Sequence, residues 1–381
     1  MRTILILLGT SALAACSGGG PTTVGGNAVQ TPGGGTTTTH TFVNPTDPKT
    51  YQAIGASSSY SYSTDPVAQV QYGQLYAGNA NTVRDTGLQI TYNPRDGIFD
   101  MKIADAKSNT NIDTRFQDPA HRTAFGGALE PQPGAPDLTS KGVIYFENGT
   151  ASGVFNTTGY SGMAQTFFYQ KPGTTTKYVT YAGYMRNELN QGEFTLNGGT
   201  VLRSNYTRKR AAFVYGERTS NNAVPKTGTG TFTGQMLASM VYNPLLDVDP
   251  SAPTYYQWID GTSTTTVDFA ANSFTLALAG SVHAPNFDLN TSQTFAMPVG
   301  ATFNAAGGGR IDLVNAGGFV GQLTSAYFLN GANRTDLTIA GSSIDGSFFG
   351  PAAEEVGGGF RVVGGTPDQR IDILGVFTGA R

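Results

Sequence analysis

The chain has 381 residues, with 51 Gly, 22 Phe and 18 Tyr but only one Cys, one Trp and three His. Charged residues make up 13% of it and the formal net charge is −3. So much Gly excludes coiled coils and helical bundles, a single Cys excludes a disulfide framework, and the weak negative charge gives no electrostatic basis for nucleic-acid binding. A β protein rich in Gly, Thr and aromatic residues remains, and it is long enough for two domains.

Residues 1–15 are typical of a bacterial lipoprotein signal peptide. Arg2 supplies a positive start, and residues 4–15 form an apolar or small stretch that is too short for a membrane-spanning helix. The stretch ends in the sequence LAAC, which resembles a lipobox, so we expect Cys16 to carry a covalent lipid. The alternative is an ordinary signal peptide whose cleavage leaves Cys16 as a free thiol.

Residues 16–40 begin with Cys16 and continue as a run of Gly, Thr and Ser without apolar periodicity. Such a composition cannot bury a core, so we predict a disordered tether. A chain of this kind and length has a root-mean-square reach of roughly 27 Å. The lipid and the tether would together hold a folded body at a distance from a membrane.

The next part of the chain, residues 41–222, shows the alternation of apolar and polar residues that is typical of β-strands. Residues 88–92 and 98–103 alternate on either side of an Asn-Pro-Arg-Asp-Gly turn, which predicts a β-hairpin. Further strands are predicted at 143–146, 165–169 and 177–185, and a long Pro-rich loop at 118–139.

Residues 223–381 contain short strands at a regular spacing. Strands are predicted at 229–240, 264–269, 273–282, 293–303, 318–328, 337–349, 359–363 and 370–378. Eight short strands joined by Gly-, Asn- and Pro-bearing turns predict an antiparallel sheet that closes into a barrel. The expected interior is filled by side chains or holds one small ligand.

Three segments of this region resemble the β-barrel domain of the transferrin-binding protein B family of surface lipoproteins. The strongest is FFGPAAEEVGGGF at residues 348–360, together with GVFTGAR at 375–381. The sequence VPKTGTGTFTG at 224–234 is similar to the start of that barrel, and VDF at 267–269 to one of its hairpins, with Ala277 where Gly is usual.

The resemblance implies an all-β fold with an N-terminal antiparallel β handle domain, residues 41–222, and an eight-stranded antiparallel β-barrel, residues 223–381. Family members join a handle and a barrel into a lobe, and the namesake has two lobes. The residues after Cys16 leave room for one lobe. Smaller relatives bind other host proteins, haem or haem carriers.

The motif FFGPAAEEVGGGF also has a direct physical interpretation. Gly350 and Pro351 are expected to end a strand, and Gly357 and Gly358 to allow a close approach of backbones. The adjacent carboxylates of Glu354 and Glu355 could suggest a metal or acid–base site. Because no His or third acid lies nearby in the sequence, we expect a structural role instead, such as pairing with an Arg.

No catalytic motif is present: the sequence has no G-x-S-x-G, H-E-x-x-H, P-loop or Rossmann fingerprint, so we predict no enzyme, no catalytic residues and no metal site. His283 follows a predicted strand and precedes Pro285. We expect it to be a structural residue at the strand end, and haem bound by His283 or by tyrosines is the alternative.

The predicted Pro-rich loop at 242–261 is the best candidate binding surface. It gathers apolar and aromatic side chains of the kind that protein interfaces favour: Leu245, Leu246, Tyr255, Tyr256 and Trp258. The alternative is that these side chains close one mouth of the barrel or pack on the handle, since an exposed patch of this size promotes aggregation.

These observations predict an outer-membrane lipoprotein that faces the cell exterior and binds an extracellular protein in iron or nutrient acquisition. Further expected partners are an outer-membrane receptor or exporter and the membrane itself, through the lipid on Cys16. A haem or small-ligand carrier of the same architecture is the alternative. A membrane-spanning barrel is disfavoured by the lipobox and by the lack of aromatic girdles.

Overall fold

The computed structural model describes residues 41–65, 70–74, 80–117, 131, 134–245, 248–249, 254–285, 296–365 and 369–381. The predicted signal peptide and tether, including Cys16, lie outside these ranges. Within them the chain forms strands, two short 3₁₀ turns and no α-helix. Accordingly, the described part contains no helix long and apolar enough to span a membrane.

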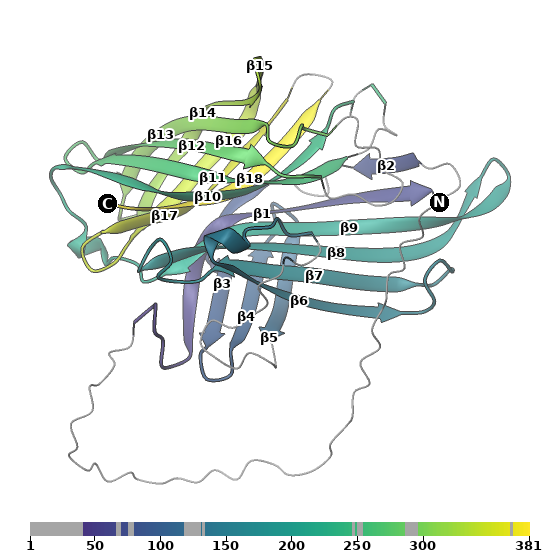
Figure 1. Ribbon diagram of the computed structural model, residues 1–381, viewed down its shortest axis with the longest axis horizontal. Helices are drawn as coiled ribbons and strands as arrows, with labels where there is room; N and C mark the ends of the chain where they lie inside the picture. The colour runs from purple at the N-terminus through teal and green to yellow at the C-terminus, as the bar shows by residue number, and fades with distance from the viewer. Residues whose placement is uncertain are drawn as a thin grey trace, which may run out of the picture. The chain divides into compact units, whose positions relative to one another are not determined.

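The first half of the described chain forms one antiparallel sheet, here called the handle sheet (Figure 1). Its strands are β1 Lys49–Asp65, β2 Val70–Gln74, β3 Asn81–Asn93, β4 Ile98–Asp105, β5 Thr110–Gln117, β6 Val143–Ser152, β7 Ser161–Gln170, β8 Val179–Leu196 and β9 Gly199–Gly216. They lie in the order β5-β4-β3-β1-β9-β8-β7-β6, and β2 pairs with β1.

The predicted hairpin at 88–103 is confirmed as β3–β4, in which Leu88 pairs with Ile103 and Asn93 with Ile98. Its alternating apolar side chains point into a core rich in aromatic rings. There the ring of Phe99 lies 4.9 Å from that of Tyr169 and 5.3 Å from that of Phe167. The alternation seen in the sequence therefore marks the buried face of the handle sheet.

The second half of the chain forms the barrel. Its strands are β10 Thr229–Asn243, β11 Tyr255–Asp268, β12 Ser273–Val282, β13 Thr302–Asp312, β14 Gly318–Asn330, β15 Asn333–Asp336, β16 Ile339–Phe349, β17 Glu355–Gly364 and β18 Arg370–Ala380. The order is β13-β12-β11-β10-β18-β17-β16-β14, and β13 also pairs with β14, which closes an eight-stranded ring. The short β15 pairs only with the end of β14. The predicted all-β fold, with a handle followed by an eight-stranded antiparallel barrel, is confirmed.

Strand β13 lies almost entirely outside the range predicted for it. The strand expected at 293–303 is β13, Thr302–Asp312. It was misplaced because Gly307, Gly308 and Gly309 weaken the strand signal. In the barrel these glycines allow β13 and β14 to come close: a Cβ on Gly307 would collide with the carbonyl oxygen of Gln322, and one on Gly309 with that of Val320.

The handle sheet and the barrel pack against each other through a mixed core of apolar and charged side chains. At its centre Arg210 of β9 is completely buried, as is nearly all of Asp372 of β18. The Arg210 guanidinium donates to a carboxylate oxygen of Asp372 (3.1 Å), to the Asp372 carbonyl (2.9 Å) and to the Ser239 carbonyl (2.7 Å). The other carboxylate oxygen of Asp372 accepts the backbone N–H of Ala80 at 3.1 Å. A buried, hydrogen-bonded ion pair thus joins the two sheets.

A second ionic contact joins β3 to β16. Arg84 lies 2.7 Å from the carboxylate of Asp345, and the neighbouring Asp85 lies 2.6 Å from Arg218, the other cation close to Asp345. Burial raises the pKa of Asp345 to about 6, because the loss of hydration outweighs the attraction of Arg84 and Arg218. The protonated form is therefore favoured in the folded protein relative to the unfolded chain.

We expect the stability contribution of Asp345 to decrease as the pH rises. Between the ordinary pKa of about 4 and the folded value, the folded state binds a proton that the unfolded state does not, so the free energy of unfolding falls with pH. The free energy of unfolding of the wild type minus that of Asp345→Asn should therefore fall by about 2–3 kcal/mol between pH 4 and 7. Urea denaturation of both proteins across this range measures it, and a difference that is constant or grows with pH would contradict the assignment.

Candidate functional site

The predicted binding loop at 242–261 is shorter than expected. Strand β10 continues to Asn243 and β11 already begins at Tyr255, so the last third of the predicted loop is a strand. The prolines stop at Pro253, and the following residues are aromatic or β-branched types that favour strands. The loop prediction for residues 255–261 is therefore wrong.

The three aromatic residues proposed as ligand contacts are buried. Tyr255 and Tyr256 are 0% exposed and Trp258 is 3% exposed. The Trp258 indole donates a hydrogen bond to the Gly134 carbonyl at 2.6 Å, and its ring meets Phe168 of the handle edge-on at 5.1 Å. Tyr256 and Trp258 thus hold the barrel on the handle, which is the packing alternative. Leu245 is half-buried, and Leu246 lies outside the described residues.

A different loop presents apolar side chains to solvent. Residues 153–160 connect β6 and β7, and there Val154 is 69% exposed and Phe155 is 55% exposed. The loop is held by Gln191 of β8: its side-chain oxygen accepts the backbone N–H of Asn156 at 2.8 Å, and its backbone N–H donates to the Tyr160 carbonyl at 2.9 Å. The Gln191 side chain is itself 5% exposed and donates to Ser204. The two apolar residues are therefore displayed on a fixed frame.

Another exposed apolar side chain lies at the same end of the handle sheet. Phe194, near the tip of the β8–β9 hairpin, is 37% exposed and is covered on one ring face by the Arg203 guanidinium at 3.2 Å. On the barrel, Val248 and Val299 are about two-thirds exposed, in the loops after β10 and β12. We call the set on the handle the distal surface: Val154, Phe155 and Phe194.

The described chain begins at the other end of the handle strands. Val43 touches the turn between β7 and β8 at Gly173, and Lys49 forms an ion pair with Glu217 just after β9. Strand β8 then runs for 18 residues to its tip, a length of about 60 Å. Figure 1 shows the β6–β7 and β8–β9 hairpins extending past the barrel on the side away from these contacts. The distal surface is thus the end remote from the point where the chain enters the fold.

His283 has a structural partner. Its Nε2 lies 2.5 Å from a carboxylate oxygen of Asp260, whose other oxygen bonds Lys141 of the handle. Burial alone would raise the pKa of Asp260, but the hydrogen bonds from His283 and Lys141 lower it. This arrangement agrees with a strand-end structural histidine, and haem binding stays a hypothesis. In the described ranges no three His, Cys, Asp or Glu side chains gather as metal ligands would.

The carboxylates of the FFGPAAEE motif bind backbone groups. Glu355 is 4% exposed and accepts three backbone N–H groups of the handle, from Lys177 (2.6 Å), Tyr178 (2.8 Å) and Val179 (3.1 Å). Glu354 accepts the N–H of Ala352 within its own turn. The expected structural role is thus found, with backbone N–H groups as partners in place of an Arg.

The sequence did carry a weak signal for the distal surface. Val154 and Phe155 are two large apolar residues between Gly153 and the polar run Asn-Thr-Thr-Gly, where a turn needs none. An apolar pair inside a turn is a departure from local expectation, and such departures often mark functional positions. The contribution of Gln191, which follows Asn156 by 35 residues, is not visible in the sequence.

Comparison with known protein families shows which family the barrel resembles. Residues 224–381 match the family described as "C-lobe and N-lobe beta barrels of Tf-binding protein B". No curated protein is similar enough to the chain to count as a match.

Solved structures of transferrin-binding protein B also align with the chain. A double mutant of the protein from Haemophilus parasuis Hp5 has 12% identity, covers 88% of this chain and 77% of its own, and gives a TM-score of 0.29. Intact Ap-TbpB (N and C lobes) has 12% identity, 87% and 78% coverage and a TM-score of 0.29. Isotype 1 of the protein from serogroup B Neisseria meningitidis has 10% identity, 88% and 77% coverage and a TM-score of 0.26. TM-scores this low carry no argument of their own. The similarity to the transferrin-binding protein B family therefore rests on the family match of residues 224–381.

The residues matched begin just before β10 and end with the chain after β18, so they span the closed eight-stranded ring and the FFGPAAEE turn. Residues 224–381 of this chain are therefore similar to the β-barrel domains of the transferrin-binding protein B family.

Proposed function

We propose that the protein is a lipid-anchored lipoprotein of the outer membrane that captures an extracellular protein at its distal surface. The anchor is the lipid on Cys16, which follows the signal peptide of residues 1–15, and residues 16–40 are the tether. The family of the barrel supports a binding protein rather than an enzyme.

The single observation that carries the proposal is the display of Val154 and Phe155 on a loop fixed by Gln191. Exposed apolar side chains on a rigid loop lose little conformational entropy on binding and fill pockets of a partner well. Their position, about 60 Å along β8 from the place where the tether joins the fold, would turn them away from the membrane. The partner is then a folded protein with an apolar recess, taken up for iron or nutrient acquisition.

The test uses a double variant, Val154→Ser with Phe155→Ser, in the full chain. A partner is first recovered from host or environmental fluid by affinity capture and identified by mass spectrometry, and its binding is then measured with the purified proteins. We expect the double variant to bind at least about 30-fold more weakly, the loss of one interface hot spot.

The matched control is Val314→Ser. Val314 is 92% exposed, and it lies in the β13–β14 turn at the opposite end of the barrel. Its replacement should leave the affinity unchanged. Equal losses in the two variants, or none in either, would show that the distal surface does not bind the partner.

A further inference from the structure

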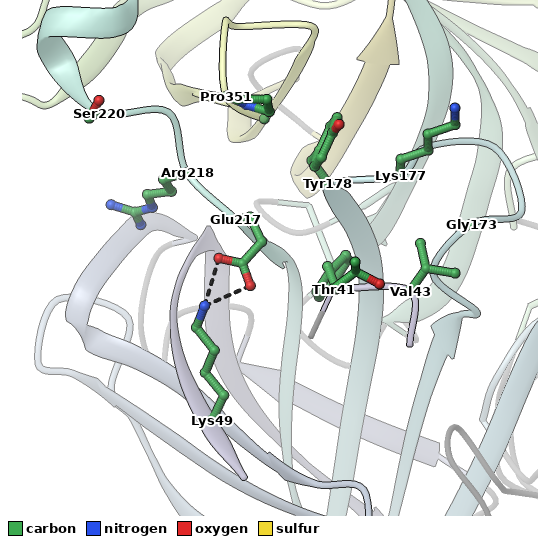
Figure 2. A pocket seen from close by; sticks show the side chains of 12 residues that line it. Thr41, Val43, Lys49, Gly173, Lys177, Tyr178, Glu217, Arg218, Ser220 and Pro351 are labelled. Atoms are coloured by element: carbon green, nitrogen blue, oxygen red, sulfur yellow. Dashed lines mark hydrogen bonds and ion pairs between the residues drawn. The ribbon is translucent and has the colours of Figure 1, made fainter. Parts of the chain in front are cut away.

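A pocket of about 710 Å³ lies where the handle meets the barrel, far from the distal surface (Figure 2). Its walls come from the first described residues, from the β7–β8 turn, from the linker after β9 and from the Gly350–Pro351 turn of the barrel. The volume lies within the range of small-molecule sites. Segments far apart in the sequence thus build one cavity.

The FFGPAAEE motif shapes two walls of this pocket. Glu355 fixes the backbone of Lys177 and Tyr178, both of which line it. Gly350 has a φ of +89°, and a Cβ at this position would lie 2.7 Å from the Tyr178 ring. Only glycine therefore satisfies both the turn and the close contact with Tyr178. The pocket is held by buried contacts between the two sheets.

Some charged side chains of the pocket have an ion-pair partner of opposite charge, and one cation does not. Glu217 is neutralised by Lys49, whose ammonium lies 2.6 Å from both carboxylate oxygens (Figure 2). Arg218 is paired with Asp85 at 2.6 Å. Lys177 is exposed and forms no ion pair among the described residues. The lining holds three cations and one anion, so an incoming anion is favoured.

The hydroxyl groups in the pocket wall that lack a hydrogen-bond partner also favour the binding of an anion. In the described part of the chain, the hydroxyls of Tyr178 and Ser220 have no hydrogen-bond partner, and both line the pocket. With the Lys177 ammonium they offer three donors, and the one carboxylate present is already occupied by Lys49. The apolar part of the wall comes from Phe42, Val43 and Pro351.

We propose that this pocket binds an amphipathic anion, in which a phosphate or carboxylate is joined to an apolar chain. The acid group would accept hydrogen bonds from the neighbouring residues Lys177 and Tyr178, as ammonium and hydroxyl groups commonly bind phosphate. The apolar chain would lie on Phe42, Val43 and Pro351. The site is independent of protein capture at the distal surface.

The test is calorimetric titration of the full chain, freed of lipid, with lauroyl lysophosphatidic acid below its micelle concentration. Lauroyl lysophosphatidylcholine has the same acyl chain but no net charge, and inorganic phosphate has the acid group alone. We expect one molecule of lysophosphatidic acid to bind per chain, about tenfold or more tightly than either comparison compound. Equal binding of the three compounds, or no saturable binding of lysophosphatidic acid, would overturn the proposal.

A pair of variants places the site. Lys177→Gln should weaken binding about tenfold, the value of one charge-assisted hydrogen bond. Lys171→Gln makes the same charge change in the same turn, at a residue that does not line the pocket, and should leave the affinity within about twofold. Both lysines are exposed, so both variants should fold like the wild type. Equal effects of the two substitutions would mean that the anion binds elsewhere.

Discussion

Asp372→Ala is expected to lower the free energy of unfolding by about 3–5 kcal/mol, the range found when one partner of a buried ion pair is removed. The substitution leaves the completely buried Arg210 without its counter-charge and the backbone N–H of Ala80 without its acceptor. The protein contains a single tryptophan, Trp258, which is buried between the two sheets. Denaturation followed by its fluorescence therefore reports directly on the separation of handle and barrel.

Two controls make this result specific. Asp113→Ala removes a carboxylate that is 73% exposed and lies 3.6 Å from Lys102, and should cost less than about 0.5 kcal/mol. The double variant Arg210→Met with Asp372→Leu removes both charges together and should be closer in stability to the wild type than Asp372→Ala. A loss below about 1 kcal/mol in Asp372→Ala would show that the pair is not buried in solution.

Trp258→Ala is expected to destabilise the protein by about 3–5 kcal/mol, as the deletion of a large buried aromatic ring does. The ring fills the contact with Phe168, and its N–H satisfies the carbonyl of Gly134. Chemical denaturation followed by circular dichroism measures the change. Trp258→Phe keeps most of the apolar volume, so its loss of unfolding free energy should be smaller than that of Trp258→Ala.

The same variants separate the two interpretations of Trp258. If the residue were an exposed ligand contact, Trp258→Phe would reduce partner binding and leave stability unchanged. With Trp258 inside the handle–barrel contact, the folded Trp258→Phe protein should bind the partner as the wild type does. Val314→Ala, at a position 92% exposed, supplies the baseline for a surface substitution, within about 0.5 kcal/mol.

The fold could be predicted to a large extent because its signals are local. The alternation at 88–103 marks a hairpin by itself, and the sequences FFGPAAEEVGGGF and GVFTGAR mark the barrel. Gly350 and Pro351 end β16 as their chemistry requires. The prediction misplaced β13 because side-chain preference and tertiary packing conflict there. Glycine has a low preference for strands, but the close approach of β14 favours glycine at Gly307–Gly309.

The site was harder to predict, because burial is decided by the partner sheet. Tyr255, Tyr256 and Trp258 have the composition of an interface. Tyr256 and Trp258 do form one, but within the chain, between barrel and handle, while Tyr255 packs inside the barrel. A sequence cannot tell an internal interface from an external one when both are aromatic. The pocket at the junction gave no signal at all, since Lys49, Lys177 and Ser220 come together only when β1, β9 and β8 pair within the handle sheet.

Capture of an extracellular protein by the distal surface is tested most directly by cross-linking on intact cells. A photoreactive amino acid replaces Phe155 in one strain and Val314 in another, and the cells are irradiated in the fluid that supplies the partner. The account predicts a cross-linked extracellular protein at position 155 and none at position 314. Cross-links at 314 and none at 155, or no access of externally added protease to the protein on intact cells, would contradict it.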